Sequence, residues 1–142
     1  MQPVLLDSSI YITALRAGEE AVLTLRRWAP QASVWLSAVV LEELYAGVRR
    51  RDRHVVERLE RDFDRARRIL VPALSDWTQA GKVLAQLAAE CGYERIGQGR
   101  LTNDALIAMS AARQGITVIT ANERDFARLA RFRPFPYEVK AP

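Results

Sequence analysis

Short apolar runs alternate along the chain with stretches in which apolar residues recur every three or four positions. The short runs predict buried strands, and the helical spacing predicts helices between them. The predicted strands are residues 4–6, 34–36, 69–71 and 117–120, with 137–139 as a last edge strand. The first predicted helix opens after Asp7, a second ends at Pro30, and a third runs from Ser37 through Val48. Further helices are predicted at 51–68, 75–92, 103–114 and 122–131, with a glycine-containing loop at 93–100.

Strands that alternate with helices are typical of parallel βαβ units. The chain has 142 residues, 49% of them apolar and 27% charged, which fits one globular domain. No repeat, linker or low-complexity segment interrupts it. We therefore predict an α/β protein in which residues 1–142 form a single three-layer α/β/α domain with a central parallel sheet.

Several classes of protein are disfavoured by composition. The longest near-continuous apolar run, residues 34–41, includes Ser37 and is far shorter than the ~20 residues of a membrane-spanning helix. The N-terminus lacks the basic start of a secretory signal. The single cysteine, Cys91, cannot form an internal disulfide, and we expect it to be a small buried residue in a reducing compartment. A soluble cytoplasmic protein is the expectation.

The net charge of +4 has one local source. Residues 49–68 contain nine arginines and five acids, so their excess equals the charge of the whole chain. Interleaved acids favour a solvated helix with ion pairs, while contact with nucleic acid or protein stays an alternative. In this segment Val55, Leu59 and Phe63 recur every four residues and form one apolar stripe.

Four acids are predicted to meet at one edge of the sheet. Open α/β sheets bind ligands beyond the carboxyl ends of their strands. Asp7 follows the first strand, Asp125 follows the fourth, Asp104 opens a helix, and Glu43 lies in the helix after the second strand. Singly, each has a simpler explanation: a helix cap for Asp7, a helix-dipole partner for Asp104, a capping box with Asn122 for Asp125, and a surface position for Glu43.

Helical phase distinguishes Glu43 from its neighbour Glu42. At about 100° per residue, Glu43 lies on the inward flank and Glu42 points to solvent. Gly47, costly in a helix, is explained by clearance beside Glu43 or by close backbone packing.

Convergent carboxylates need a cation to stay ionised together. Oxygen ligands without a Cys/His cluster favour Mg²⁺, or Mn²⁺, over zinc. The only histidine, His54, lies in the charged segment, so Ser-His-Asp and Cys-His catalysis lack support. Phosphate-binding glycine loops are also missing from the sequence. Hydrolysis of a phosphodiester with Mg²⁺ is the reaction that remains.

The motifs around these acids resemble those of PIN-domain ribonucleases, and most closely the VapC toxins of bacterial toxin–antitoxin pairs. The resemblance spans residues 5–126. It rests on Leu5-Leu6-Asp7-Ser8-Ser9, on Ser37 with Glu43-Leu44 and Gly47, on Asn103-Asp104-Ala105-Leu106-Ile107-Ala108, and on Thr120-Ala121-Asn122-Glu123-Arg124-Asp125-Phe126.

The resemblance implies a catalytic acidic pocket on a parallel sheet between helical layers. Asp7 and Asp104 would be the main metal ligands, and Glu43 and Asp125 would complete the pocket directly or through water. Thr120 and Asn122 would support it by hydrogen bonds. The expected reaction is hydrolysis of RNA to 5′-phosphate and 3′-hydroxyl ends.

The same resemblance implies partners. These toxins usually dimerise and are neutralised by a small VapB antitoxin. Helices around residues 40–70 of the toxin commonly form part of the groove that binds the antitoxin. The stripe of Val55, Leu59 and Phe63 is therefore expected to contact the antitoxin or to pack in the core. A secondary role in RNA binding is predicted for Arg49, Arg50 and Arg51.

Two alternatives stay open. One is a PIN-like domain without turnover that binds RNA or a protein partner. The other is a receiver-like phosphoacceptor domain, in which Lys140 would match the terminal lysine. The second fits poorly, because Ser8 and Ser9 follow Asp7 where an acid pair is needed.

Overall fold

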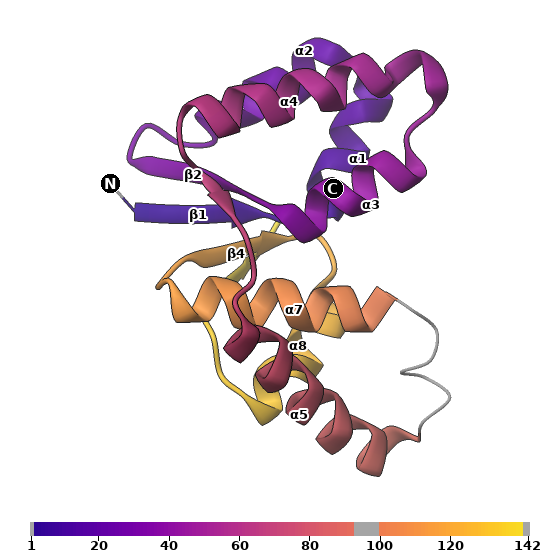
Figure 1. Ribbon diagram of the computed structural model, residues 1–142, viewed down its shortest axis with the longest axis vertical. Coiled ribbons are helices and arrows are strands. Elements are labelled where there is room, and N and C mark those ends of the chain that lie inside the picture. The colour runs from indigo at the N-terminus through magenta and orange to yellow at the C-terminus, as the bar shows by residue number, and fades with distance from the viewer. Residues whose placement is uncertain (1, 93–99, 141–142) are drawn as a thin grey trace.

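Five parallel strands form one sheet in the order β3-β2-β1-β4-β5 (Figure 1). A computed structural model describes residues 2–92 and 100–140. Most of the glycine-containing loop predicted at 93–100 lies outside these residues. The strands are β1 (Gln2–Leu6), β2 (Ala32–Ser37), β3 (Ile69–Leu70), β4 (Thr117–Thr120) and β5 (Tyr137–Val139).

Helices cover both faces of the sheet, in two groups that Figure 1 separates clearly. One group is α1 (Ser8–Ala17), α2 (Glu19–Thr24), α3 (Ala38–Gly47) and α4 (Arg53–Arg65); the other is α5 (Leu74–Cys91), α7 (Arg100–Arg113) and α8 (Glu123–Phe132). Short 3₁₀ turns, η1 (Leu25–Arg27) and η2 (Arg50–Asp52), precede β2 and α4. The predicted α/β/α layers are confirmed.

The core lies between the sheet and these helices. Leu5 and Leu6 of β1 and Val118 and Ile119 of β4 are fully buried, as expected for parallel strands covered on both faces. The apolar stripe of α4 is buried as well, with Phe63 only 4% exposed. The stripe therefore packs in the core of this chain, and its side chains are not available to contact an antitoxin.

The strand order reverses between β1 and β4. The chain leaves β1 toward β2 and β3 on one side, then crosses back to β4 on the other side. Pairing of Leu6 with Ile119 places Asp7 beside Thr120, and the Asp7 N–H donates to the Ile119 carbonyl. Such a reversal opens a crevice at the carboxyl ends of the strands, which is where ligands bind in open α/β sheets.

Several local predictions need correction. Cys91 is exposed, not buried, because it ends α5 on the solvent side. Helix α5 begins at Leu74 and not after Ser75, since the Asp76 carboxylate accepts a hydrogen bond from the Ala73 N–H at 2.7 Å and sets the start of the helix. Close backbone packing does not explain Gly47, because a Cβ there would meet nothing within 4 Å.

Within the described ranges, no helix is both long and apolar enough to cross a membrane.

Candidate active site

Asp7 directly follows β1 and caps the N-terminus of α1. Its Oδ1 accepts hydrogen bonds from the backbone N–H of Ser9, at 3.1 Å, and from the Ser9 hydroxyl. Its Oδ2 accepts from the Thr120 hydroxyl at 2.7 Å. The side chain is 2% exposed. The carboxylate is therefore held in one orientation by donors from two separate elements.

Two hydroxyl groups connect this carboxylate to the turn after β4. The Thr120 hydroxyl accepts from the Asn122 N–H at 2.9 Å, and the Ser9 hydroxyl accepts from the Ala121 N–H at 3.0 Å. Both side chains thus accept from the backbone while they donate to Asp7. Ser9 has a structural part in the site that sequence reasoning did not assign, although a hydroxyl two residues after a capping aspartate is a local signal for it.

Burial raises the pKa of Asp7 above its ordinary value of 3.8. The hydrogen bonds from Ser9 and Thr120 act in the opposite direction but do not cancel the loss of hydration. A buried carboxylate of this kind gains from a cation close by, because the positive charge favours its ionised form.

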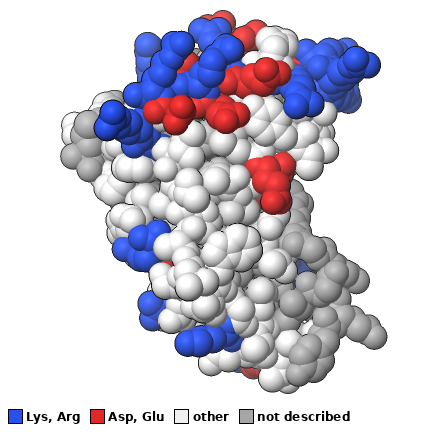
Figure 2. Space-filling model, viewed as in Figure 1, with Lys and Arg blue, Asp and Glu red and all other residues white. Residues whose placement is uncertain are grey.

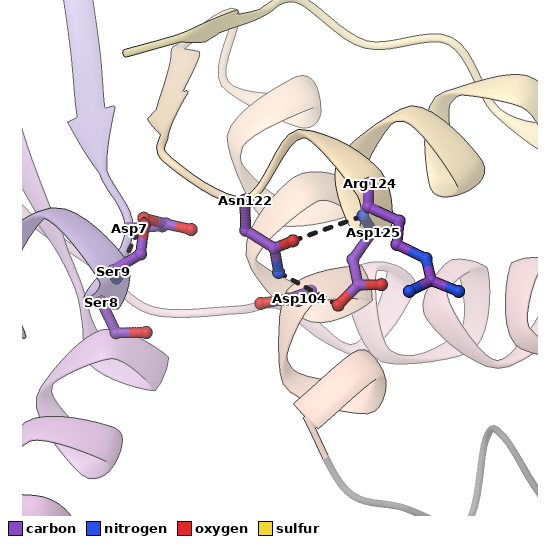
Figure 3. A pocket seen from close by; sticks show the side chains of 7 residues that line it. All are labelled: Asp7, Ser8, Ser9, Asp104, Asn122, Arg124 and Asp125. Atoms are coloured by element: carbon purple, nitrogen blue, oxygen red, sulfur yellow. Dashed lines mark hydrogen bonds between the residues drawn. The ribbon is translucent and has the colours of Figure 1, made fainter. Parts of the chain in front are cut away.

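A cavity of about 290 Å³ opens in front of Asp7. Figure 3 shows the side chains that line it, which come from the end of β1, the start of α1, α7 and the start of α8. Three of them are acids, Asp7, Asp104 and Asp125, and Asp104 is only 3% exposed. The fold therefore brings three carboxylates from separate parts of the chain to one pocket.

Asp125 has a capping role in addition to its place in the pocket. The Asn122 amide donates to the Asp125 carboxylate at 3.0 Å, and the Asn122 side-chain oxygen accepts from the Asp125 N–H at 3.5 Å (Figure 3). Asn122 is the N-cap of α8. The pair fixes the first turn of α8 and holds the Asp125 carboxylate at the edge of the pocket.

Glu43 does not line this pocket. It lies in a second cavity, of about 540 Å³, beside α1 and α3. Glu43 is half-buried and Glu42 is exposed, as the predicted helical phase requires. Glu42 accepts a hydrogen bond from the Asn103 amide at 3.2 Å, so α3 is tied to α7 next to Asp104. The acids thus divide between two neighbouring cavities.

The PIN domain family matches residues 4–132. The chain belongs to this family. Its fold is similar to that of DNA-bound VapBC from Salmonella typhimurium, with a TM-score of 0.67, 21% identity, and coverage of 98% of both chains. It is also similar to VapBC2 from Rickettsia felis bound to a promoter DNA fragment, with a TM-score of 0.66, 22% identity, and coverage of 98% of this chain and 99% of that one.

VapBC-1 from nontypeable Haemophilus influenzae is a third similar structure, with a TM-score of 0.61, 19% identity, and coverage of 97% of this chain and 98% of that one. At these identities the likeness shows a shared fold. No curated protein sequence matches the chain significantly. Membership of the PIN domain family excludes the receiver-like alternative. The Lys140 ammonium lies 5.9 Å from the centroid of the Trp28 ring.

The donor set of this PIN domain fits a hydrated divalent cation. In the part of the chain that the structure describes, no three Asp, Glu, His or Cys side chains are placed to hold one metal ion together. Mg²⁺ does not need such a cage, because it keeps several waters and is usually held by one or two carboxylates and the phosphate of the substrate. Asp7 and Asp104, both buried beside one cavity, meet that lesser requirement.

The arginines predicted to bind RNA, Arg49, Arg50 and Arg51, lie at the N-terminal end of the charged segment 49–68. Arg49 and Arg51 line the cavity that contains Glu43, whereas Arg50 does not. Figure 2 shows basic side chains gathered over α4 and the turn before it, with acids among them. Ion pairs join Arg53 to Glu57 and Arg58 to Glu19 on this side, so the expected solvated, paired helix is present.

Proposed function

We propose that this protein is a metal-dependent endoribonuclease that acts as the toxin of a VapBC-type toxin–antitoxin pair. The observation that supports the proposal most directly is the pocket of three aspartates at the reversal of strand order in a PIN domain. Nuclease chemistry is general among PIN domains and typically uses a divalent metal. RNA as the substrate, and Mg²⁺ or Mn²⁺ as the metal, are parts of the proposal.

In this proposal Asp7 and Asp104 hold the cation, and Glu43 and Asp125 complete the site directly or through water. Thr120 keeps the Asp7 carboxylate in place by its hydrogen bond, and Asn122 does the same for Asp125. When bound, the cation supplies positive charge that offsets the acids, attracts the scissile phosphate and lowers the pKa of a water molecule.

The residues of the chain then position the reactants. A pocket carboxylate accepts a proton from the attacking water and orients that water for attack on phosphorus, in line with the 3′ oxygen. The bond between phosphorus and the 3′ oxygen breaks, and the 3′ oxygen takes up a proton from solvent water, which leaves a 3′-hydroxyl and a 5′-phosphate. Burial of Asp7 and Asp104 keeps their carboxylates from turning toward solvent, so the geometry is set before RNA arrives.

The test is cleavage of single-stranded RNA by Asp7→Asn and Asp104→Asn variants, with Mg²⁺, Mn²⁺ or EDTA. Both variants should lose metal-dependent cleavage yet remain folded, because each removes one charge from an acidic site. Glu42→Gln is the matched control, since Glu42 is exposed outside the pocket. Cleavage at the wild-type rate in either variant contradicts the assignment.

A VapB-like antitoxin and a second copy of the chain are the proposed partners. The similar structures are VapBC complexes, which supports the antitoxin. The pair would act in the cytoplasm. Expression of the chain alone should arrest growth. Co-expression with the product of a short adjacent reading frame should relieve the arrest, and that product should co-purify with the chain. Size-exclusion chromatography with light scattering measures whether the free chain is a dimer.

A PIN domain that binds RNA or a partner without turnover is the second candidate. It is favoured by the fact that the acids among the described residues do not form a ready three-ligand metal site. RNA binding that persists while cleavage is absent with every divalent metal tested would support this candidate against the first.

A further inference from the structure

A groove runs beside the acidic pocket, between α1, α3 and the segment that leads to α4. Its volume is about 540 Å³. Helix α1 contributes to both cavities, with Ser8 and Ser9 in the pocket and its later residues in the groove. We call this second cavity the arginine groove, and its lining includes Ile12, Leu15, Arg16, Leu44, Val48 and Arg49.

The floor of the arginine groove is apolar. It is formed by two residues of α1, one of α3 and Val48, of which Leu44 is fully buried and the others are half-buried. Gly47 also lines the groove, and because a Cβ at this position would meet nothing within 4 Å, the surface there is open. A flat apolar face of a ligand can therefore lie against the floor.

The rim carries three arginines and two acids, namely Arg16, Arg49, Arg51, Glu43 and Asp52. Arg51 lies 3.9 Å from Asp52, which leaves Arg16 and Arg49 as the groove arginines without an ion pair to any described residue. Arg16 and Arg49 are exposed and, among the described residues, neither is within 4 Å of a carboxylate. By contrast, Arg58 on the same side of the sheet pairs with Glu19. Unpaired guanidinium groups beside an apolar floor suit a ligand that carries anionic groups along a backbone and flat apolar faces beside it.

We propose that the arginine groove binds the single-stranded RNA next to the cleaved bond. Arg16 and Arg49 contact phosphates, and the floor contacts a nucleobase. This inference rests on the proposed nuclease function and adds Arg16 to the residues that hold the substrate.

The distance of Arg16 from Asp7 determines which nucleotide Arg16 can contact. Arg16 lies nine residues after Asp7 on α1, which is about 13 Å along the helix axis. That distance is too long for Arg16 to contact the phosphate held at Asp7, so Arg16 meets a neighbouring nucleotide. A duplex is disfavoured because its bases are stacked and paired and cannot reach the apolar floor.

The experiment measures binding of a fluorescent single-stranded RNA in EDTA, so that it is not cut, over a series of salt concentrations. Arg16→Gln and Arg49→Gln should each weaken binding about tenfold, as expected for one charge-assisted contact. Each should also reduce the slope of log K against log salt by about 0.7, the value for one phosphate contact with a single strand.

Arg61→Gln is the matched control. Arg61 is exposed on α4, has no carboxylate within 4 Å among the described residues and lies outside the groove. It removes the same charge, so any general effect of net charge appears in it as well. The proposal is overturned if Arg16→Gln and Arg49→Gln have the same RNA affinity and the same salt slope as Arg61→Gln.

Two further measurements separate the possible failures. In a cleavage assay with Mg²⁺, the groove variants should raise KM more than they lower kcat. If the wild type cleaves RNA and both variants keep its KM, the groove proposal fails and the nuclease function stands. If the wild type cleaves nothing but the variants weaken RNA binding, the nuclease function fails and the groove stands. If the variants lose binding only to a poly-glutamate peptide, the occupant is a protein and the proposal is overturned.

Discussion

The Thr120 hydroxyl is the most informative single group to remove from the site. Thr120 is fully buried, donates to the Asp7 carboxylate at 2.7 Å and accepts from the Asn122 N–H at 2.9 Å. The variant Thr120→Val keeps the shape and the β-branched character that suit a strand. It removes both hydrogen bonds together, so its effect measures how strongly the strand end holds the carboxylate.

The expected loss of stability follows from the two bonds. A hydrogen bond to a charged group contributes about 1.5–3 kcal/mol, and a partly buried N–H without its partner costs about 1 kcal/mol. Thr120→Val should therefore lower the free energy of unfolding by about 3 kcal/mol at neutral pH. For a chain of this length, that corresponds to a decrease in Tm of about 10 °C.

Chemical denaturation in EDTA, over a range of pH, is the assay. The bond from Thr120 favours ionised Asp7, so its loss raises the pKa of Asp7 further. The stability that this bond contributes is present when Asp7 is ionised and is lost as pH falls through the pKa of Asp7 in the folded state. The gap between variant and wild type should therefore narrow in acid.

Thr117→Val on the same strand is the matched control, because the Thr117 hydroxyl has only a 3.5 Å contact with Gln2 at the surface. Combining Thr120→Val with Asp7→Asn gives a double-mutant cycle, in which the pair should be coupled by about 1.5–3 kcal/mol. Equal effects of Thr120→Val and Thr117→Val, or a coupling near zero, would refute the view that Thr120 holds Asp7.

Three other outcomes are expected. Wild-type stability in EDTA should contain a component that increases as pH falls through the raised folded-state pKa of Asp7 toward 3.8, because burial disfavours the ionised form, and Asp7→Asn should remove this component. Glu43→Gln should reduce RNA cleavage strongly while Glu42→Gln leaves it near wild type; the reverse order would contradict the helical phase. Phe63→Ala should lower the free energy of unfolding by about 3–5 kcal/mol in denaturant titrations, and a surface-like loss below about 1 kcal/mol would deny its core role.

Much of the architecture can be read locally. Asp7, Ser37 and Asn122 are capping residues, and each precedes a helix whose first turn it hydrogen-bonds. The strands are short apolar runs because parallel strands are buried on both faces. These properties depend on neighbours a few residues apart, so periodicity and capping chemistry were enough to predict them.

Errors at this level had equally local causes. Helix α5 starts two residues earlier than expected, with Ala73 instead of Ser75 as its N-cap, because the Asp76 carboxylate accepts a hydrogen bond from the Ala73 N–H. Cys91 is exposed because it ends α5, which its residue type alone did not indicate.

The meeting of distant residues was decided by the packing of the sheet. Asp7 and Thr120 are 113 positions apart and touch because β1 pairs with β4. Placement of Glu43 in the arginine groove, and of Arg16 beside it, likewise depends on how α1 and α3 pack. Periodicity assigns a side chain to one face of its own helix or strand. Which other elements lie against that face depends on the strand order and on the crossing of the chain from β3 to β4, which no local pattern encodes.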